Sequence, residues 1–585
     1  MKILQLFKKL WPYLLQYKSK LIFGFLCIII SNLLNIINPK IVSKAIDYFQ
    51  GDIKIGRLLT YAGALIAVTI VFGFFRFLTR RTVIVVSRLI ENDMRNDLFA
   101  KLQSLSSTFY QQNNTGDIMA RLTNDLNAVR SVLGPGLMYT VNTIATFIFV
   151  IIMMLTINPL LTLMAMIPVP LMVVAVNYFN RQINKTYTAV QDQYAAISTK
   201  AQENLAGIRI VKSYVLEKLE LDSFNLLNKD YIKKNMRYVK YNAAYRPTMM
   251  LIVGIGIAII LLFGGRMIIN DVITLGEYVA FNLYLGMLVF PSIALGWVMG
   301  IFYQGVASMN RLDYILRAES DIADESANKI DALLISGEIE CKNLSFTYPT
   351  AEEPALQNIN LKVARGEIIA VVGRTGAGKS TLMQLLTRIF EPEDATLFLD
   401  GRDIKKIPLK QLREHIGYIP QDTFLFSDTI RNNIAFGVAD ADQEKIEWAA
   451  RIAQIHDSIL ELPDGYDTIL GERGINLSGG QKQRMSIARA ILKEPKILLL
   501  DDALSAVDTI TEEAILNDLK NIMINKTCFW VSHRISSIKN ADHIIVLDQG
   551  KIVEEGTHEE LLMQNGIYAD LFEKQQLEES LSLTE

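Results

Sequence analysis

Charge-free runs of apolar residues dominate the first half of the chain. The runs without Asp, Glu, Lys or Arg are residues 21–39, 58–75, 131–180, 247–265 and 278–310. A helix that crosses the hydrocarbon core of a bilayer needs roughly 20 apolar residues, because no water there satisfies exposed backbone groups. Buried core helices of a large soluble protein are the alternative, but such a protein rarely contains so many runs of this length. The pattern therefore predicts six membrane-spanning helices, near residues 21–39, 58–75, 137–156, 160–179, 247–268 and 278–304.

The distribution of Lys and Arg predicts the orientation of these helices. The segment before the first helix and the segments after the second and fourth are rich in basic residues, Arg80 and Arg81 among them. The alternate connections are less basic, with Lys54, Arg57 and Arg266 among their charges. Because Lys and Arg concentrate in cytoplasmic loops, we expect a multi-pass protein of the cytoplasmic membrane with both termini in the cytoplasm.

Two long connections, residues 76–130 and 181–246, are polar with a helical pattern. The spanning helices are therefore expected to continue well past the membrane. Each connection is expected to turn back at a short segment, residues 110–124 and residues 203–214, and the first of these contains the turn signal Asn-Asn-Thr-Gly. These segments would touch a structure below the membrane. Ordinary solvated helical hairpins are the alternative.

Composition narrows the function classes. Hydrophobic residues make up 50% of the 585 residues, charged residues make up 21%, and the formal net charge is −2. This balance excludes a disordered chain and a basic protein that coats nucleic acid, so no nucleic-acid partner is expected. Cys27, Cys341 and Cys528 lie far apart without metal-ligand spacing, which predicts neither a disulfide framework nor a zinc site.

The pattern changes after residue 311. Residues 318–336 are acidic, and beyond them short apolar strands alternate with helical segments. This alternation predicts an α/β domain with a largely parallel sheet. The expected organisation is an α-helical membrane domain at residues 1–324, a linker at 325–336 and an α/β domain at 337–585.

The sharpest motif of the second domain follows the apolar run at residues 368–372. It has the form GxxxxGK[ST] and opens a helical segment. Glycines in this setting let backbone N–H groups turn toward phosphate oxygens, and the helix N-terminus adds its dipole. Lys379 would reach the β- and γ-phosphates, and the Ser380 hydroxyl would bind Mg²⁺. The motif predicts a P-loop ATPase domain whose ATP site contains Gly373, Arg374, Thr375, Gly376, Ala377, Gly378, Lys379, Ser380 and Thr381.

A second apolar strand, at residues 497–500, ends in Asp501. A carboxylate at the end of a buried strand beside a phosphate loop is where a metal ligand belongs. Ser380 and Asp501 are therefore predicted to hold Mg²⁺. A plain helix cap is the alternative for Asp501.

Between these two motifs lies a signature segment, which reads Leu-Ser-Gly-Gly-Gln. It consists of Leu477, Ser478, Gly479, Gly480 and Gln481. With these motifs the chain resembles, over essentially its whole length, the ATP-binding cassette (ABC) exporters in which six spans and one nucleotide domain are fused. The resemblance implies two nucleotide domains that sandwich two ATP molecules, each held by one phosphate loop and the other domain's signature segment. An isolated helix cap by Ser478 is the alternative.

The resemblance implies roles for further residues. Tyr348 is similar to the aromatic residue that stacks on adenine, and a core or sheet-edge tyrosine is the alternative. Gln421 resembles the glutamine that reaches Mg²⁺ and the attacking water. His533 resembles the switch histidine at the γ-phosphate, with an ordinary surface histidine as the alternative. Residues 471–474 resemble the segment that touches the coupling helices, and residues 505–508 the stretch that crosses the dimer interface.

One position departs from the family pattern. The residue after the strand-terminal Asp501 is usually Glu, the general base on the attacking water, and here it is Asp502. Asp is one methylene shorter, and a general base must reach one particular water. A small misplacement can cost on the order of 10²-fold in rate. ATP is expected to bind while hydrolysis at this site is slow; adequate hydrolysis after a small backbone shift is the alternative.

Together these features predict one half of a heterodimeric exporter of amphipathic or hydrophobic compounds, drugs or lipids. The chain resembles the degenerate-site subunit of bacterial heterodimeric multidrug exporters, and its partner would carry Glu at the catalytic position. The expected ligands are ATP, Mg²⁺, the lipid bilayer and a small hydrophobic substrate. The alternatives are a homodimeric lipid or peptide exporter with two equivalent sites, and a nucleotide-gated regulatory or channel-like protein.

The last predicted span contains several Met and aromatic residues. Such residues suit adaptable binding of varied apolar molecules, although plain helix packing explains them more often. The candidates for a substrate cavity are Phe281, Tyr284, Met287, Phe290, Trp297 and Met299.

Overall fold

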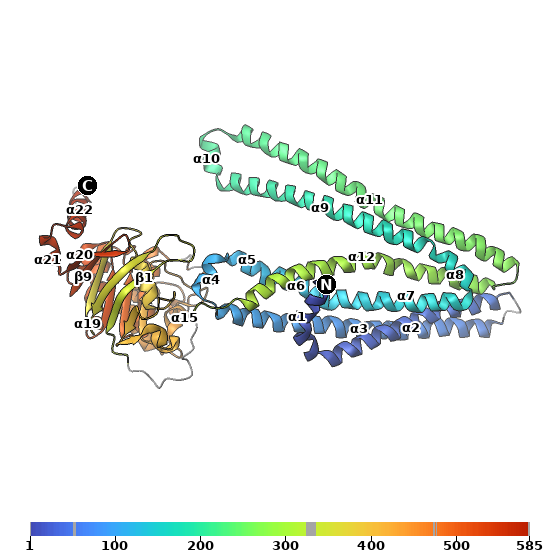
Figure 1. Cartoon of the computed structure of the whole chain (residues 1–585), viewed down its shortest axis with the longest axis horizontal. Helices are drawn as coiled ribbons and strands as arrows, with labels where there is room; N and C mark the ends of the chain where they lie inside the picture. Colours follow the sequence, from blue (N-terminus) through green and yellow to red (C-terminus); the bar gives the residue numbers. More distant parts are fainter. Residues whose placement is uncertain (1, 51–53, 323–334, 472–473, 475–476, 583–585) are drawn as a thin grey trace. The chain divides into compact units, whose positions relative to one another are not determined.

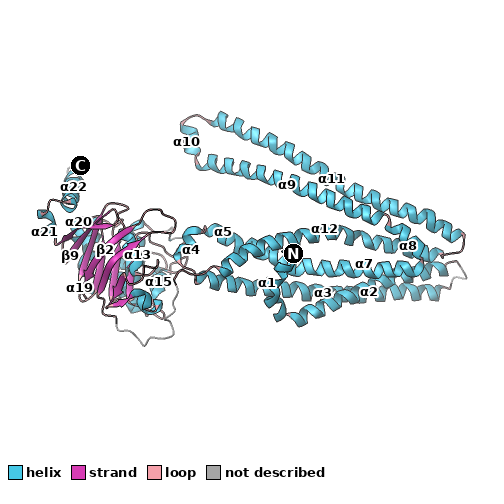
Figure 2. Cartoon of the chain, in the orientation of Figure 1, coloured by secondary structure: helices cyan, strands magenta, loops and turns pink. Residues whose placement is uncertain are grey.

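Two compact units make up the protein, whose structure is a computed structural model (Figure 1). The structure describes residues 2–50, 54–322, 335–471, 474 and 477–582. The first unit comprises Met1–Gln103 and Gly116–Ala318, and the second comprises Ser104–Thr115 and Glu319–Glu585. In Figure 2 the first unit is helical, and the strands of the described chain all belong to the second.

Among the described residues, six helices are long and apolar enough to cross a membrane. They are α2 (Lys18–Tyr48), α3 (Ile55–Gln103), Thr115–Ile157, Pro159–Ala206, α11 (Glu217–Ile269) and α12 (Leu275–Arg317). The six predicted spans all lie inside these helices, so the prediction of an α-helical membrane domain is confirmed. At 1.5 Å per residue, α3 with 49 residues and α11 with 53 are about 73 and 80 Å long. They therefore extend far beyond a hydrocarbon core of ~30 Å.

Two of these helices are composed of several segments. The third consists of α5 (Thr115–Ala120), the π-helical turn η1 (Arg121–Asp125), α6 (Leu126–Ser131), the π-helical turn η2 (Val132–Gly136) and α7 (Leu137–Ile157). The fourth consists of α8 (Pro159–Met166) and α9 (Pro168–Ala206). Asn158 separates the third spanning helix from the fourth. Its backbone is extended, and its side chain accepts a hydrogen bond from the Leu161 N–H at 3.0 Å. The break between the predicted spans at 137–156 and 160–179 therefore falls at Asn158.

Three shorter helices complete the N-terminal half: α1 (Lys2–Gln16), α4 (Ser107–Gln112) and α10 (Ile208–Ser213). The chain turns at Asn113, which has an extended backbone between α4 and α5. It turns again at Gly207, between α9 and α10. Both turns fall inside the segments predicted to reverse the chain, at residues 110–124 and 203–214.

Polar contacts join the helices of the first unit inside their apolar runs. Asn32 of α2 donates a hydrogen bond to Asn142 at 3.0 Å and accepts one from the Thr146 hydroxyl at 2.7 Å, both on α7. The Tyr284 hydroxyl of α12 donates to the Ile36 carbonyl at 2.9 Å. Because hydrocarbon offers no competing partners, such bonds hold neighbouring helices in one register.

The Met and aromatic side chains of α12 divide between two environments. Phe281 and Tyr284 are fully buried and pack in the core of the unit, as the helix-packing alternative predicts. Met287 and Phe290 line a cavity. The candidates Trp297 and Met299 are exposed on this chain.

The second unit contains two sheets. The antiparallel one has the order β2 (Leu356–Val363), β1 (Ile339–Phe346), β4 (Leu397–Leu399), β5 (Arg402–Asp403). The larger one has the order β10 (Lys551–Gly556), β9 (His543–Asp548), β3 (Ile368–Gly373), β8 (Thr527–Val531), β7 (Ile497–Asp501), β6 (Ile416–Ile419). Its strands are parallel except for β10, so the prediction of a largely parallel sheet is confirmed.

Apolar side chains alternate between the two faces of the larger sheet. On β3, Ile369 and Val371 join one core cluster, whereas Ala370 and Val372 join the other. Helix α13 (Lys379–Leu386) packs on the first face, and α16 (Gln443–Ile452), α18 (Gly479–Leu492) and α19 (Thr509–Met523) pack on the second. The sheet is therefore covered on both faces, as parallel sheets require.

The remaining helices of the second unit are short or terminal. They are η3 (Ile404–Lys406), α14 (Leu409–Glu414), α15 (Ile430–Ile434), η4 (Ala435–Gly437), α17 (His456–Leu460), η5 (Gly465–Asp467), α20 (Ile535–Ile538), α21 (His558–Met563) and α22 (Ile567–Ser582). Helix α12 ends at Arg317, and β1 begins at Ile339. Most of the predicted linker at residues 325–336 lies outside the described residues, and the domain limits stay a prediction.

Candidate functional site

Strands of the larger sheet end at a common edge, and the predicted site residues follow them. β3 ends at Gly373, the first residue of the phosphate loop, and β7 ends at Asp501. β8 ends two residues before His533, and β6 ends two residues before Gln421. Since ligands of α/β sheets bind outside the carboxyl ends of the strands, this edge gathers residues that are far apart in the sequence.

The phosphate loop, residues 373–380, requires glycine at two positions. Gly373 and Gly378 have φ angles of 152° and 102°. A Cβ atom on Gly373 would lie 2.1 Å from the Leu547 carbonyl oxygen, and one on Gly378 would lie 2.6 Å from the Ala355 carbonyl oxygen. Only glycine fits these close approaches at these backbone angles.

Lys379 begins α13 and folds back over the loop. Its Nζ donates hydrogen bonds to the carbonyls of Gly373 at 2.7 Å and Arg374 at 2.9 Å. Burial lowers the pKa of Lys379, and the negative charges of Asp501 and Asp502 oppose this shift. The ammonium group is thus held at the loop by neutral oxygens, which phosphate oxygens can replace.

Ser380 and Asp501 form a pair of oxygen ligands. The Ser380 hydroxyl donates to Asp501 Oδ1 at 3.0 Å. Burial, more than any other cause, raises the pKa of the Asp501 carboxyl; the Ser380 hydrogen bond lowers it, and the charge of Asp502 adds to the rise. The charges of Lys379 and His533 also lower the pKa of Asp501. The Ser380 hydroxyl and the Asp501 carboxylate are hard oxygen donors, which Mg²⁺ prefers, and a cation would stabilise the buried negative charge.

Asp502 is buried and its backbone is firmly held. Its φ of 52° lies in the left-handed region, where Asp and Asn are the most tolerated residues after Gly. Its N–H donates to the Val531 carbonyl at 3.0 Å. Its carbonyl accepts from the Ser505 hydroxyl at 3.1 Å and from the Gln483 amide at 3.4 Å. A backbone shift that would advance the short carboxylate must break these bonds.

Tyr348 lies beside the phosphate loop. Its hydroxyl forms hydrogen bonds with the Thr381 hydroxyl at 2.9 Å and the Gln384 side chain at 3.0 Å, both on α13. Its ring is half-buried and meets Phe390 edge-on, with the centroids 5.2 Å apart. The core role is therefore observed, and the stacking role on adenine stays a prediction.

Gln421 and His533 are both exposed at the strand edge. In the part of the chain that the structure describes, the Gln421 side chain has no hydrogen-bond partner. The backbone carbonyl of His533 accepts a hydrogen bond from Gln575 of α22. The charge of His533 acts on Asp501, while the predicted contacts of His533 with the γ-phosphate and of Gln421 with Mg²⁺ stay predictions.

The signature segment forms the start of α18. Ser478 accepts a hydrogen bond from the Gln481 N–H at 3.2 Å, and the Ser478 N–H donates to the Gln481 side chain at 2.9 Å. This capping box realises the helix-cap alternative, and it also orders the helix N-terminus that would face a phosphate. A Cβ atom on Gly480 would lie 2.7 Å from the Ala506 carbonyl oxygen, so α18 packs closely on the loop after Asp502.

Two further residues contact the site and are identified by the structure alone. The first is Gln483 of α18, whose amide donates to the Ser505 hydroxyl at 3.0 Å and accepts from the Ala506 N–H at 2.9 Å. The second is Tyr418 of β6; burial, and then the charge of Asp501 on the adjacent strand β7, raise the pKa of its hydroxyl. A lone polar side chain in an apolar strand was the signal for Tyr418, whereas Gln483 had none.

Two predicted contact segments have different outcomes. In residues 505–508, Asp508 caps α19 by accepting a hydrogen bond from the Thr511 N–H at 2.9 Å. In residues 471–474, residues 472–473 lie outside the described residues. The roles of both segments at domain interfaces stay predictions.

Comparison with known proteins identifies the family. The model of the ABC transporter transmembrane region matches residues 21–292, and the ABC transporter model matches residues 356–505. The chain is 36% identical to "Probable multidrug resistance ABC transporter ATP-binding/permease protein YheI" of Bacillus subtilis, over 97% of each chain. The chain belongs to the ABC transporters. An ABC exporter with a fused six-span domain and nucleotide-binding domain hydrolyses ATP to drive transport.

Two further relatives support this assignment. The chain is 35% identical to the ATP-dependent lipid A-core flippase of Syntrophus aciditrophicus, over 98% of this ABC exporter and 95% of the relative. Among solved structures, a bacterial Atm1-family ABC exporter with ATP bound aligns with a TM-score of 0.79 at 28% identity. That alignment covers 95% of this chain and 98% of the other.

Proposed function

We propose that this ABC exporter is one half of a heterodimer that moves amphipathic or hydrophobic compounds, drugs or lipids, outward across the cytoplasmic membrane. The phosphate loop of this chain and Asp502 form a slow, regulatory ATP site. The signature segment of this chain completes a fast site on a partner chain that carries Glu. The observation that carries the proposal is the presence of Asp502, a shorter base than Glu, beside a phosphate loop that keeps the groups that bind nucleotide.

Asp502 supports slow hydrolysis for a geometric reason. Its carboxylate is one methylene shorter than that of Glu, and hydrogen bonds to both its backbone N–H and its carbonyl oppose a compensating shift. Loss of a well-placed general base costs roughly 10²–10⁴-fold in rate. Lys379, Ser380 and Asp501 retain the charges and hydrogen-bonding groups that bind nucleotide, so binding persists where hydrolysis is slow.

The predicted site residues would bind MgATP in the following way. Mg²⁺ would be held by Ser380, Asp501 and Gln421, and it would neutralise charge on the β- and γ-phosphate oxygens. Tyr348 would stack on adenine, and His533 would contact the γ-phosphate. Leu477, Ser478, Gly479, Gly480 and Gln481 would contact the ATP that is bound to the partner chain.

The proposed orientation places both termini in the cytoplasm. The basic segments before α2, along the second half of α3 and along α9 and α11 support it. In this orientation α4, α5 and α10, at the turns between long helices, lie on the cytoplasmic side. They are the candidates for coupling helices between transport and ATP hydrolysis.

Steady-state phosphate release from purified, reconstituted protein tests the heterodimer. The chain alone should have little ATPase, and a partner with Glu should restore it. Asp502→Asn should reduce turnover of the heterodimer modestly, whereas Glu→Gln in the partner should nearly abolish it. Asp502→Glu should raise basal turnover. Asp442→Asn is the matched control, because Asp442 lies outside the predicted site and interface segments and Asn still caps α16.

A homodimeric lipid or peptide exporter with two equivalent sites is the second candidate. The intact signature segment and the buried carboxylate of Asp502 would allow it, and one relative is named as a lipid A-core flippase. Transport-coupled ATPase from this chain alone, abolished by Asp502→Asn, would establish this candidate and refute the heterodimer. Co-purification of the tagged chain from its own cell would identify the partner directly.

A further inference from the structure

A half-polar cavity lies inside the first unit, between α2, α3, α7 and α12. It encloses about 970 Å³, its open mouth included. One part of its wall is apolar and contains Met138 of α7 with Met287 and Phe290 of α12. Another part is polar and contains Asn35 of α2 and Asn142 of α7. The wall residues from α2, α7 and α12 all belong to charge-free runs.

Two arginines are the charged residues of this wall. Arg76 and Arg80 lie one turn apart on α3, and both are exposed. Within the described residues, neither guanidinium forms a hydrogen bond or has a carboxylate within ion-pair distance. Arg76 lies over the ring of Phe72, 5.6 Å from its centroid, which leaves its N–H donors free. The cavity wall therefore carries two positive charges and no negative one.

Unpaired charge of this kind is costly beside apolar helices, and in membrane proteins it marks ligand or ion pathways. Residues at i and i+4 point to the same side of a helix, so Arg76 and Arg80 can act on one ligand. The planar guanidinium donates paired hydrogen bonds to phosphate, sulfonate and carboxylate groups. The neighbouring Met and Phe side chains offer an adaptable apolar surface.

We propose that this cavity binds an amphiphile with an anionic head group. Arg76 and Arg80 hold the head, and the apolar body packs against Met138, Met287 and Phe290. The inference rests on the proposed export function and names the class of substrate within it. The head could belong to a membrane lipid or to an amphipathic anion from the aqueous phase, and the experiment below separates these sources.

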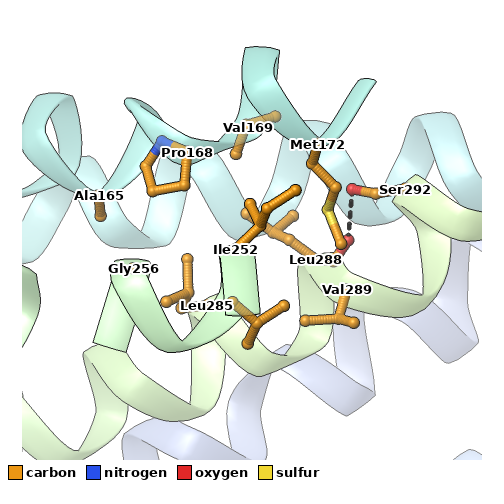
Figure 3. A pocket seen from close by; sticks show the side chains of 11 residues that line it. Ala165, Pro168, Val169, Met172, Ile252, Gly256, Leu285, Leu288, Val289 and Ser292 are labelled. Atoms are coloured by element: carbon orange, nitrogen blue, oxygen red, sulfur yellow. Dashed lines mark hydrogen bonds between the residues drawn. The ribbon is translucent and has the colours of Figure 1, made fainter. Parts of the chain in front are cut away.

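A second hollow of the first unit has the opposite character (Figure 3). It measures about 350 Å³, its open mouth included, between α8, α9, α11 and α12, and apolar side chains such as Met172, Ile252 and Leu288 line it. Its polar side chain, Ser292, donates to the Leu288 carbonyl at 2.8 Å and is therefore satisfied within the helix. Leu288 and Ser292 lie on a different face of α12 from Met287 and Phe290. Of the two hollows, the one on the Met287 and Phe290 face of α12 therefore has the charged groups that suit an anionic head.

The test uses the assembled exporter in phosphatidylcholine vesicles with three fluorescent or radiolabelled probes. They are NBD-labelled phosphatidylglycerol as an anionic lipid, taurocholate as an aqueous amphipathic anion, and rhodamine 6G as an amphipathic cation. ATP-dependent movement of each probe is measured for the wild type and for the double variant Arg76→Gln/Arg80→Gln. The double variant should raise the half-saturating concentration of the transported anion at least roughly 10-fold, because hydrogen bonds to charged groups are lost. Rhodamine 6G should bind unchanged or more tightly.

Two controls separate binding from structure. Arg81→Gln removes the adjacent charge of α3, which does not line the cavity, and should leave anion transport within about 2-fold of the wild type. Arg76→Lys/Arg80→Lys keeps both positive charges and should recover part of the anion affinity. A purely structural role of the arginines would affect all three probes equally.

Each outcome bears on the proposal. Transport of phosphatidylglycerol alone assigns the head to a lipid, and transport of taurocholate alone assigns it to an aqueous anion. Anion transport that is unchanged in Arg76→Gln/Arg80→Gln overturns the inference, as does a wild type that moves only rhodamine 6G; in both cases the export function stands. A wild type that moves none of the probes, although its ATPase is active, refutes the proposed export function itself.

Discussion

The nucleotide site and the membrane cavity handle charge in opposite ways. At the nucleotide site the ammonium of Lys379 lies near two carboxylates, Asp501 and Asp502, and its N–H donors already have partners in the phosphate loop. In the membrane cavity the guanidinium groups of Arg76 and Arg80 have no carboxylate partner in the described part of the chain. The ammonium of Lys379 therefore has two carboxylates beside it, whereas the two guanidinium groups of the cavity have none among the described residues.

This difference indicates what each site binds. Two carboxylates beside the ammonium of Lys379 favour a ligand that brings a divalent cation together with its phosphates, as MgATP does. Two guanidinium groups without a carboxylate favour an anion alone. Removing a charged group should therefore have different consequences in the two regions, and the following predictions test the comparison.

The largest effect is expected from Lys379→Ala. The nucleotide affinity of this chain should fall roughly 10²-fold, because a charge-assisted contact to the phosphates is lost. Titration with a fluorescent ATP analogue measures it, and Lys362→Ala, an exposed lysine of β2, is the control. The heterodimer should keep a measurable part of its ATPase. Equal losses of ATPase from the lysine variants of the two chains would contradict unequal sites.

A smaller effect is expected from Asp501→Asn, which should stabilise the folded nucleotide domain. The pKa of Asp501 is raised in the folded protein, above 3.8, so its ionised form opposes folding at neutral pH. This cost is complete above the raised pKa and is relieved as the pH falls from there to 3.8. The variant should raise the unfolding temperature of the nucleotide domain, without nucleotide or Mg²⁺, by about 2–4 °C at pH 7.

The same variant should weaken Mg²⁺-dependent nucleotide binding, since a metal ligand is lost. Differential scanning fluorimetry from pH 5 to pH 8 measures the stability difference, which should shrink toward low pH. Asp442→Asn is the control and should leave the unfolding temperature unchanged, because Asp442 caps α16 and Asn caps a helix as well as Asp does. A lower unfolding temperature for Asp501→Asn would mean that the Ser380 hydrogen bond outweighs the cost of burial.

An effect of similar size on stability, but of opposite sign, is expected from Asn32→Leu at the membrane cavity. Asn32 bonds to Asn142 and Thr146, so the variant leaves both without this partner. Hydrogen bonds between membrane helices contribute about 0.6 kcal/mol each, so a loss of about 1 kcal/mol in stability is expected. Thermal unfolding in detergent measures it, with Asn35→Leu as the control, since Asn35 lines the cavity and its side chain forms no hydrogen bond among the described residues. A larger loss for Asn35→Leu would show that the polar wall is structural and weaken the contrast between the regions.

The conformation of the phosphate loop and the helix starts beside it was predictable because the signals are local. Each signal lies within a few residues of its partner. Lys379 bonds to the carbonyls of Gly373 and Arg374, and Ser478 accepts a hydrogen bond from the Gln481 N–H. Gln483 and Tyr418 were missed, since their importance depends on loop 502–506 and on Asp501 of the neighbouring strand. Asp502 was recognised from its position after the strand, but the hydrogen bonds that hold its backbone came only from the fold.

The sequence by itself determined the six spanning helices, the parallel α/β domain and the phosphate loop. These follow from the length of apolar runs, from strand periodicity and from backbone angles that only glycine adopts. The tertiary structure decided which side chains of α12 are buried, such as Phe281, and which line the cavity, such as Met287. It also placed Arg80, which the sequence grouped with the flanking basic residues, on the wall of that cavity. The rotation of each helix about its axis depends on contacts with its neighbours, and a charge-free run does not encode those contacts locally.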